Sequence, residues 1–289
     1  MKLRNLISET VQLAGLRLIN AVAKSGGYRV DRGLTYGTKT RNELDHYVLH
    51  AGSVADKSKR PLVLFIYGGN WQGGHRNDYR FVADTLCTLG CDVVVPDYRL
   101  YPEVRFSDIL DDVRLAITWV LNNEEIDSCR PIYVMGHSAG AQLGSLLCLN
   151  PALLSHLPGA EKRIAAFIGL SGPYDFYPFT EDSHWDLFAP REDYPLSQAV
   201  NFVRREAPPL YLLHGKEDNR VRRGHSKSLM EKQLAAGGQA SREVYEGIGH
   251  VDMVVSFSVF HRRKSQAIKD IKSFIDQSMT KHTQNRLNT

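Results

Sequence analysis

Residues 131–149 read PIYVMGHSAGAQLGSLLCL, and this stretch decides the fold prediction. It opens with a short apolar run, Pro131–Met135, which is typical of a buried strand, and it closes with an apolar segment of helical length from Ala139 to Leu149. Between them lies Gly136-His137-Ser138-Ala139-Gly140, a G-x-S-x-G sequence. In this context the pattern exposes a serine hydroxyl on a sharp strand-to-helix turn. The stretch therefore predicts Ser138 as a nucleophile, with a purely structural turn serine as the alternative.

The two glycines of this pattern have a steric explanation. The chain must reverse in a tight turn, where a side chain at Gly136 or Gly140 would collide with the neighbouring strand or helix. The helix that begins here also points free N–H groups at a reacting carbonyl. We therefore expect the backbone N–H of Ala139 to be one donor of an oxyanion hole.

Outward from this stretch, strand-like and helix-like segments alternate from about residue 44 onward. This alternation predicts an α/β fold, with a mainly parallel central sheet and helices on both faces. Active sites of such sheets lie on the loops at the carboxyl ends of the strands. The expected strands are 45–49, 62–67, 92–96, 132–135, 164–170, 210–214 and 243–245, and the expected helices are 80–89, 107–121, 139–149, 225–236 and 259–279.

A second glycine-rich loop follows the expected strand 62–67. The loop reads Tyr67-Gly68-Gly69-Asn70-Trp71 and continues into Gly73-Gly74. Backbone N–H groups stabilise a tetrahedral oxyanion well because they are fixed before the reaction, and glycine lets the backbone approach closely. We expect Gly69 and Asn70 to supply two further oxyanion donors. The alternative is an ordinary glycine turn.

The general base must be chosen among eleven histidines. In this architecture the chain order is serine, acid, histidine. His250 is favoured because Gly247–His250 directly follows the last expected strand, where an imidazole can reach Ser138. Asp218, which follows the strand 210–214, is the leading candidate for the acid that orients the imidazole. Glu217 and Asp175 remain alternatives for that role.

Residues 171–208 are irregular and rich in aromatic side chains, and we expect them to form an inserted wall of the substrate pocket. Trp71, Tyr174 and Phe176 are the expected substrate-binding residues. Rings in such a loop favour an apolar acyl or alcohol group, although they could equally pack on the sheet edge. Hydrolysis of small to medium carboxylic esters through an acyl-enzyme is predicted. An arylformamidase or other amide hydrolase is the second interpretation, and a non-catalytic binding protein is a remote third.

Composition excludes several classes of protein. The 289 residues fit one large α/β domain, with 43% hydrophobic and 24% charged residues, and the net charge of +4 comes from scattered basic residues. We therefore expect no nucleic-acid partner. The four cysteines include no Cys-x-x-Cys pair, which indicates no metal site and suits a cytoplasmic location. No organic cofactor is implied, and a homo-oligomer stays open.

The two ends of the chain receive separate predictions. Residues 1–25 approximate an amphipathic helix, and charged residues interrupt any signal-like apolar run. No run of 18 apolar residues occurs, so a transmembrane helix is not expected. Residues 26–280 form the expected α/β domain, and the polar residues 281–289 are expected to be a flexible tail.

Taken together, these motifs resemble esterases of the α/β-hydrolase fold, whose first loop reads His-Gly-Gly-x-Trp and whose serine turn reads Gly-His-Ser-Ala-Gly. The similarity is greatest to the branch of feruloyl- and acetyl-esterase-like enzymes, kynurenine formamidases and isoprenylcysteine methylesterases. It covers roughly residues 30–278 and includes Asp97–Glu103, Leu213–Gly215 and Gly249-His250. Residue 137 is histidine, where the hormone-sensitive-lipase group has aspartate, which argues against that group.

The chain departs from this resemblance at Tyr67, which replaces the family histidine before the double glycine. Because that side chain supports the loop and does not donate to the oxyanion, we expect the oxyanion hole to be retained. Asp97 and Arg99 follow a buried strand, and we expect them to form a structural ion pair with no catalytic role.

Overall fold

A computed structural model of the chain describes residues 15, 19–21, 23, 26–50, 60–123, 126, 130–157 and 159–287. Most of the expected N-terminal helix, 1–25, lies outside these residues, so that helix stays a prediction.

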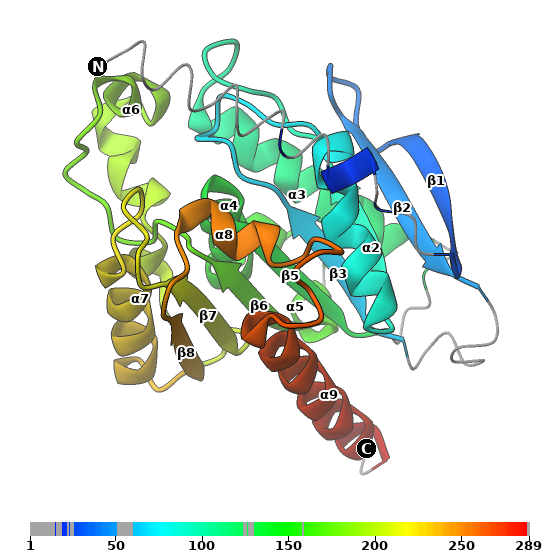
Figure 1. The fold of residues 1–289 in the computed structure, drawn as a ribbon. Coiled ribbons are helices and arrows are strands. Elements are labelled where there is room, and N and C mark those ends of the chain that lie inside the picture. The colour runs from blue at the N-terminus through cyan, green and yellow to red at the C-terminus, as the bar shows by residue number, and fades with distance from the viewer. Residues whose placement is uncertain are drawn as a thin grey trace.

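The described residues form one eight-stranded sheet with the strand order β1-β2-β4-β3-β5-β6-β7-β8 (Figure 1). The pairs β1–β2 and β2–β4 are antiparallel, whereas every other neighbouring pair is parallel. This arrangement confirms the mainly parallel central sheet. The strands are β1 (Tyr28–Thr35), β2 (Glu43–Leu49), β3 (Leu62–Ile66), β4 (Asp92–Pro96), β5 (Ile132–His137), β6 (Ile164–Leu170), β7 (Leu210–Gly215) and β8 (Ala240–Tyr245).

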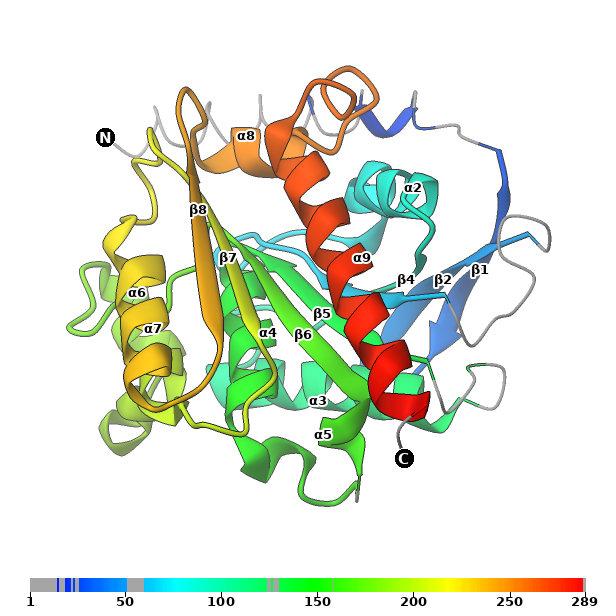
Figure 2. The ribbon, with the colours of Figure 1, turned by 90° about the horizontal axis from the view of Figure 1, so that it is seen from below.

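Helices cover both faces of the sheet, as predicted. Figure 2 shows α2 and α9 on one face and α3, α4 and α7 on the other. The α-helices are α2 (Arg80–Thr88), α3 (Phe106–Asn122), α4 (Ala139–Leu149), α5 (Ala160–Arg163), α6 (Asp182–Leu187), α7 (Gly224–Ala235), α8 (His250–Val255) and α9 (Gln266–Leu287). Short 3-10 helices are η2 (Arg76–Tyr79), η3 (Pro151–Leu154), η4 (Arg191–Ser197) and η5 (Ala199–Phe202).

The central strands have the composition of strands that are buried on both faces. All five residues of β3, LVLFI, and all five of β4, DVVVP, are buried. Helices on both faces exclude water from such strands, so continuous apolar runs replace the alternation of a half-exposed strand. β1 is different, because it lies at the sheet edge, is largely exposed and carries an irregularity between Asp31 and Leu34. Its charged and glycine-containing sequence gave no strand signal.

Both ends of the C-terminal helix differ from the sequence expectation of 259–279. α9 begins at Gln266 and not at 259, because residues 258–265 form turns in which His261 and Arg262 donate to the carbonyl of Ser258. The same helix continues to Leu287, into the range expected to be a tail. Residues 281–287 contain no proline or glycine that would stop a helix there.

In the described part of the chain, no helix is both long enough and apolar enough to cross a membrane. Cys87, Cys91 and Cys148 are free and buried. Burial raises the pKa of the Cys87 and Cys148 thiols, which favours their uncharged form.

Candidate active site

Ser138 sits on a strained turn between β5 and α4. Its φ is +54°, a left-handed value that is uncommon for a residue with a side chain, and its N–H donates to the carbonyl of Leu170 at 2.9 Å. A Cβ at Gly136 would overlap the carbonyl of Gly140, and one at Gly140 would overlap the carbonyl of Ile66. The expectation that both glycines are needed for space is therefore confirmed.

The imidazole of His250 lies between Ser138 and Asp218. His250 Nε2 is 2.8 Å from Ser138 Oγ, and His250 Nδ1 is 2.8 Å from Asp218 Oδ2. The three side chains follow β5, β7 and β8, so they meet at the carboxyl edge of the sheet. His250 is the first residue of the short helix α8, and not part of an irregular loop. The structure thus brings together the serine, histidine and aspartate that the sequence singles out.

The two alternative acids lie elsewhere. Asp175 Oδ2 accepts from the hydroxyl of Ser228 and contacts Lys232 Nζ at 3.4 Å, both on α7. Glu217 is exposed. Asp218 alone among the three carboxylates contacts the imidazole of His250.

Asp218 is held as a carboxylate by several donors. Burial by itself raises its pKa, but hydrogen bonds from His214 and His250 outweigh that effect and lower the pKa of Asp218 well below its usual range. The backbone N–H groups of Arg220 and Val221 add hydrogen bonds at 3.0 and 2.9 Å. A negative charge therefore persists beside His250 Nδ1.

His214 is a second imidazole on Asp218 that the sequence analysis did not assign to the site. His214 is fully buried at the end of β7, and its Nε2 lies 3.3 Å from Asp218 Oδ2 and 3.0 Å from the carbonyl of Val221. A carbonyl can only accept, so Nε2 carries a proton and can donate to both oxygens. The signal in the sequence was its place directly before the loop that carries Asp218.

His137, the variable residue of the serine motif, contacts the backbone of His250. His137 Nε2 donates to the carbonyl oxygen of His250 at 3.1 Å. Burial lowers the pKa of His137 to about 3, so its ring is neutral at ordinary pH. A neutral donor here fixes the chain at the point where α8 begins.

The loop after β3 lies against Ser138. A Cβ at Gly68 would be 2.8 Å from the Cβ of Ser138. Gly69, Asn70 and Trp71 all have positive φ, at 142°, 53° and 58°. Within the described residues, the backbone N–H groups of Gly69, Asn70 and Ala139 have no protein acceptor. These three N–H groups are therefore free to bind an anion.

Tyr67 supports this loop from the side away from Ser138. Its ring stacks between Tyr79, at 5.2 Å, and Tyr98, at 4.8 Å. Its hydroxyl donates to Asp97 Oδ1 at 2.7 Å and accepts from Arg41 Nη2 at 3.0 Å. The tyrosine thus takes the supporting part expected of the residue it replaces.

The predicted pair between Asp97 and Arg99 is wrong. Asp97 contacts Arg76 and, at 3.2 Å, His75, both in the segment that continues from the glycine-rich loop after β3. Arg99 points to α3, where its Nε lies 2.9 Å from Asp112 Oδ2. The backbone N–H of Arg99 donates to the same Asp112 oxygen at 2.8 Å, which fixes the chain toward α3 and away from Asp97.

Aromatic residues of 171–208, here called the aromatic wall, contact the glycine-rich loop after β3 at Trp71. The Trp71 ring stacks on Phe176 with ring centroids 6.0 Å apart and contacts Phe188 edge-on at 5.1 Å. Trp71 Nε1 also donates to Gln142 Oε1 on α4 at 3.2 Å. Two of the three expected substrate-binding residues, Trp71 and Phe176, therefore lie together beside the loop.

Tyr174 is placed differently from the expectation. It is fully buried and packs edge-on against Phe167 of β6 at 6.3 Å. A Cβ at Gly169 or Gly172 would overlap its hydroxyl, so these glycines make room for the ring inside the core. This burial contradicts a role of Tyr174 in contacting substrate. The chain after β6 first turns back onto the sheet at Tyr174, and only later residues of 171–208 contact Trp71.

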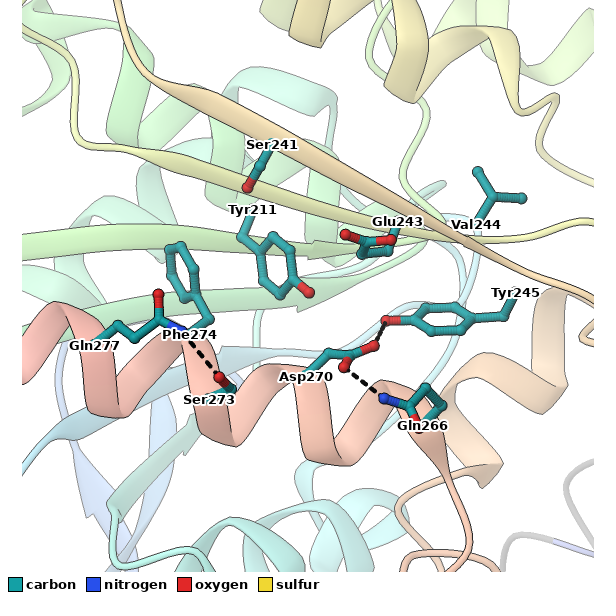
Figure 3. Close-up of a pocket in the computed structure, with 10 residues that line it drawn as sticks. All are labelled: Tyr211, Ser241, Glu243, Val244, Tyr245, Gln266, Asp270, Ser273, Phe274 and Gln277. Atoms are coloured by element: carbon teal, nitrogen blue, oxygen red, sulfur yellow. Dashed lines mark hydrogen bonds between the residues drawn. The ribbon is translucent and has the colours of Figure 1, made fainter.

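A separate surface groove of about 550 Å³ lies between β8 and α9 (Figure 3). Tyr211 and Phe274 stack at 4.6 Å along it, and the hydroxyl of Tyr245 donates to Asp270 Oδ2 at 2.9 Å. Its lining residues come from β7, β8 and α9 and include none of Ser138, Asp218 and His250.

A mainly parallel eight-stranded sheet, with a glycine-flanked serine on the turn after β5, defines an α/β-hydrolase fold. A crystal structure of a putative thioesterase from Silicibacter sp. TM1040 has this same architecture, with a TM-score of 0.71, 23% identity and 90% coverage of both chains. Within the fold, the chain belongs to the BD-FAE family, whose model matches residues 51–233.

Two curated relatives of this chain have names that state an activity. Isoprenylcysteine alpha-carbonyl methylesterase of Arabidopsis thaliana is 27% identical over 86% of this chain and 62% of its own length. Kynurenine formamidase of Drosophila melanogaster is 21% identical over 74% of each chain. The chain thus spans less than two thirds of the length of the plant methylesterase.

Proposed function

We propose that this protein is a serine carboxylesterase that hydrolyses small to medium carboxylic esters through Ser138, His250 and Asp218. One observation carries the proposal: a single imidazole lies 2.8 Å from both the Ser138 hydroxyl and the Asp218 carboxylate. Such an arrangement activates a hydroxyl that is a weak nucleophile on its own. The names of the curated relatives support ester chemistry for the family.

In the first half-reaction, Ser138 Oγ attacks the ester carbonyl carbon while its proton passes to His250 Nε2. Asp218 stabilises the imidazolium through its hydrogen bond to Nδ1. The carbonyl oxygen becomes an oxyanion, and the N–H groups of Gly69, Asn70 and Ala139 would bind it. The C–O bond of the ester then breaks, and His250 returns the proton to the leaving alcohol.

In the second half-reaction, water attacks the acyl-serine. His250 takes a proton from the water, the same N–H groups bind the second oxyanion, and the acyl–Oγ bond breaks. The proton on His250 returns to Ser138, and a carboxylic acid leaves. The balance is one ester and one water to one acid and one alcohol, with no cofactor required.

The aromatic wall favours an apolar group on the substrate. Trp71 and Phe176 stack beside the oxyanion loop, and the buried rings of Phe179 and Phe188 stack on each other behind them. Binding sites lined by rings with a few fixed polar groups suit compact apolar acyl or alcohol groups. We propose a location in the cytoplasm, which the free thiols of Cys87, Cys91 and Cys148 support.

A fluorophosphonate probe together with p-nitrophenyl acetate and butyrate tests this function. We expect the wild type to be labelled and to turn over both esters, and Ser138→Ala to lose labelling and about 10⁶-fold in kcat. Ser155→Ala is a matched control at an exposed serine and should match the wild type. A folded wild type that reacts with neither reagent would leave a non-catalytic binding role as the better explanation.

The match to kynurenine formamidase favours one second candidate, hydrolysis of a formamide by the same residues. The same chemistry then breaks a C–N bond, and His250 protonates the leaving amine. Comparison of kcat/KM for N-formylkynurenine with that for the p-nitrophenyl esters separates the two functions. A ratio of about 100 or more in favour of the formamide would replace the esterase proposal.

A further inference from the structure

A hydrogen bond joins the aromatic wall to the oxyanion loop. His184 Nε2 lies 3.3 Å from the side-chain oxygen of Asn70. His184 belongs to α6, the short helix within residues 171–208, whereas Asn70 follows β3. The two residues are 114 positions apart in sequence, so only the folded wall brings them together.

The loop that receives this bond needs external support. Asn70 and Trp71 are consecutive residues with side chains in the left-handed region, at φ values of 53° and 58°. Asparagine tolerates this region, but a bulky tryptophan there is a strained outlier. Such a residue is strained and persists only when its surroundings fix it. Gln142 fixes the Trp71 indole, and His184 is the corresponding partner of Asn70.

His184 is itself held firmly in place. Its side chain is 10% exposed, and its ring contacts Trp71 edge-on at 5.4 Å and Phe188 at 5.8 Å. Burial lowers the pKa of His184, so the neutral ring predominates near pH 7. An amide oxygen can only accept, so Nε2 carries the proton that it donates to Asn70, and Glu181 Oε2 lies slightly farther from the same nitrogen, at 3.5 Å.

We propose that His184 is a positioning residue that fixes the Asn70 side chain and thereby the backbone N–H groups of Gly69 and Asn70. This inference rests on the proposed function, because those N–H groups matter only if an oxyanion forms there. On this proposal, the histidine of the aromatic wall holds the oxyanion donors, while the ring of Phe176 packs on Trp71 beside them. Loosening this bond lowers kcat and leaves KM nearly unchanged, because the donors act mainly in the transition state.

Two substitutions at 184 separate hydrogen bonding from packing. His184→Leu keeps an apolar side chain but removes the donor, and His184→Gln keeps a donor near the position of Nε2. We expect kcat on p-nitrophenyl butyrate to fall about tenfold in His184→Leu, with KM within about twofold, and to recover to within about threefold in His184→Gln. His156→Leu is the matched control, since His156 is exposed, and it should behave as the wild type.

A double-mutant cycle with Asn70→Gly tests the partner. Glycine accepts the positive φ of position 70 but has no side-chain oxygen. If the bond acts through Asn70, His184→Leu lowers kcat little further in the Asn70→Gly background. Full additivity of the two effects, or a His184→Leu enzyme with wild-type kcat, would overturn the proposal.

Amide hydrogen exchange makes the inference independent of turnover. Exchange of residues 67–74 should be about tenfold faster in His184→Leu than in the wild type and close to the wild type in His184→Gln. This difference would support the link between wall and loop even in a protein that cleaves no ester. Equal exchange in all three proteins would overturn it, whatever the esterase assays show.

Discussion

Two buried aspartates, Asp97 and Asp218, lie at the carboxyl edge of the sheet and differ in what surrounds them. Asp97 follows β4 and accepts from guanidinium, imidazole and phenol groups, among them Arg76 and Tyr67. Asp218 follows β7 and accepts from the imidazoles of His214 and His250. Both carboxylates have side chains that are at most 1% exposed.

The two aspartates differ in what their hydrogen-bond donors contact in turn. The donors to Asp97 lead away from Ser138: Arg76, for example, also contacts Asp45 of β2 at 2.9 Å. The contact of Asp218 with His250 ends at the hydroxyl of Ser138. Burial and good pairing therefore do not by themselves identify a catalytic carboxylate. What distinguishes Asp218 from Asp97 is that its hydrogen bonds lead, through His250, to the hydroxyl of Ser138.

The largest expected effect is a loss of kcat on substitution of Asp218, which distinguishes this carboxylate from Asp97. Asp218→Asn should lower kcat about 10⁴-fold, because the amide no longer selects the tautomer of His250 that can accept the serine proton. Steady-state kinetics with p-nitrophenyl butyrate measures this, and circular dichroism verifies the fold. An Asp218→Asn enzyme with wild-type kcat would remove the distinction between the two aspartates.

The reverse pattern is expected at Asp97. Asp97→Asn removes the buried negative charge that Arg76, His75 and Arg41 share, although Arg76 keeps Asp45, so the free energy of unfolding should fall by about 3 kcal/mol. Activity of the folded fraction should stay within about tenfold of the wild type, because Asp97 has no contact with Ser138 or His250. Urea unfolding and kinetics below the transition test both parts. A loss of kcat comparable with that of Asp218→Asn would contradict the comparison.

The next prediction concerns His137, which contacts the backbone of His250, and the pH dependence of the free energy of unfolding. Burial lowers the pKa of His137 from 6.5 to about 3, so between these values the unfolded chain takes up a proton that the folded protein does not. Stability must therefore fall as pH falls through this window, by about 1.4 kcal/mol per pH unit.

His137→Gln should remove this contribution. Between pH 7 and pH 5 the variant should lose about 2 kcal/mol less unfolding free energy than the wild type, as urea titrations at the two pH values would show. His156→Gln, at an exposed histidine, should leave the wild-type dependence intact. Parallel pH dependences for His137→Gln and the wild type would contradict the buried, neutral state of His137.

The smallest effect is expected at Tyr67. Tyr67→Phe removes the hydroxyl between Arg41 and Asp97 but keeps the ring between Tyr79 and Tyr98. We expect about 1 kcal/mol lower stability by thermal or urea unfolding and kcat within about threefold of the wild type. A larger loss of kcat with normal stability would mean that the hydroxyl, and not the ring, supports the oxyanion loop.

Much of the fold could be predicted because local sequence and global topology agree. Strands β3 to β7 are mostly apolar or β-branched, since helices bury them on both faces, whereas β2 and β8 mix apolar with charged residues. The meeting of Ser138, Asp218 and His250 followed from the serine motif, the chain order of the three residues and the gathering of residues that follow parallel strands at one edge. The glycines around Ser138 marked the turn in the sequence itself.

What could not be predicted depends on contacts between distant segments. β1 pairs only on one side, so its sequence needs no apolar run. The partners of Asp97 and Arg99 were set by the direction in which the chain leaves β4, which residue types do not encode. Tyr174 and His184 both lie within 171–208, yet one turns into the core and the other onto Asn70. No period or motif distinguishes them.

The separation of 112 residues between Ser138 and His250 has a consequence during synthesis of the chain. At about 5–20 residues per second, a ribosome adds residue 250 roughly 6–22 seconds after residue 138. Throughout that interval His250 is absent from the nascent chain, so Ser138 lacks the imidazole that the proposed mechanism requires. On that proposal, esterase reactivity begins only once the segment after β8 has folded onto the sheet.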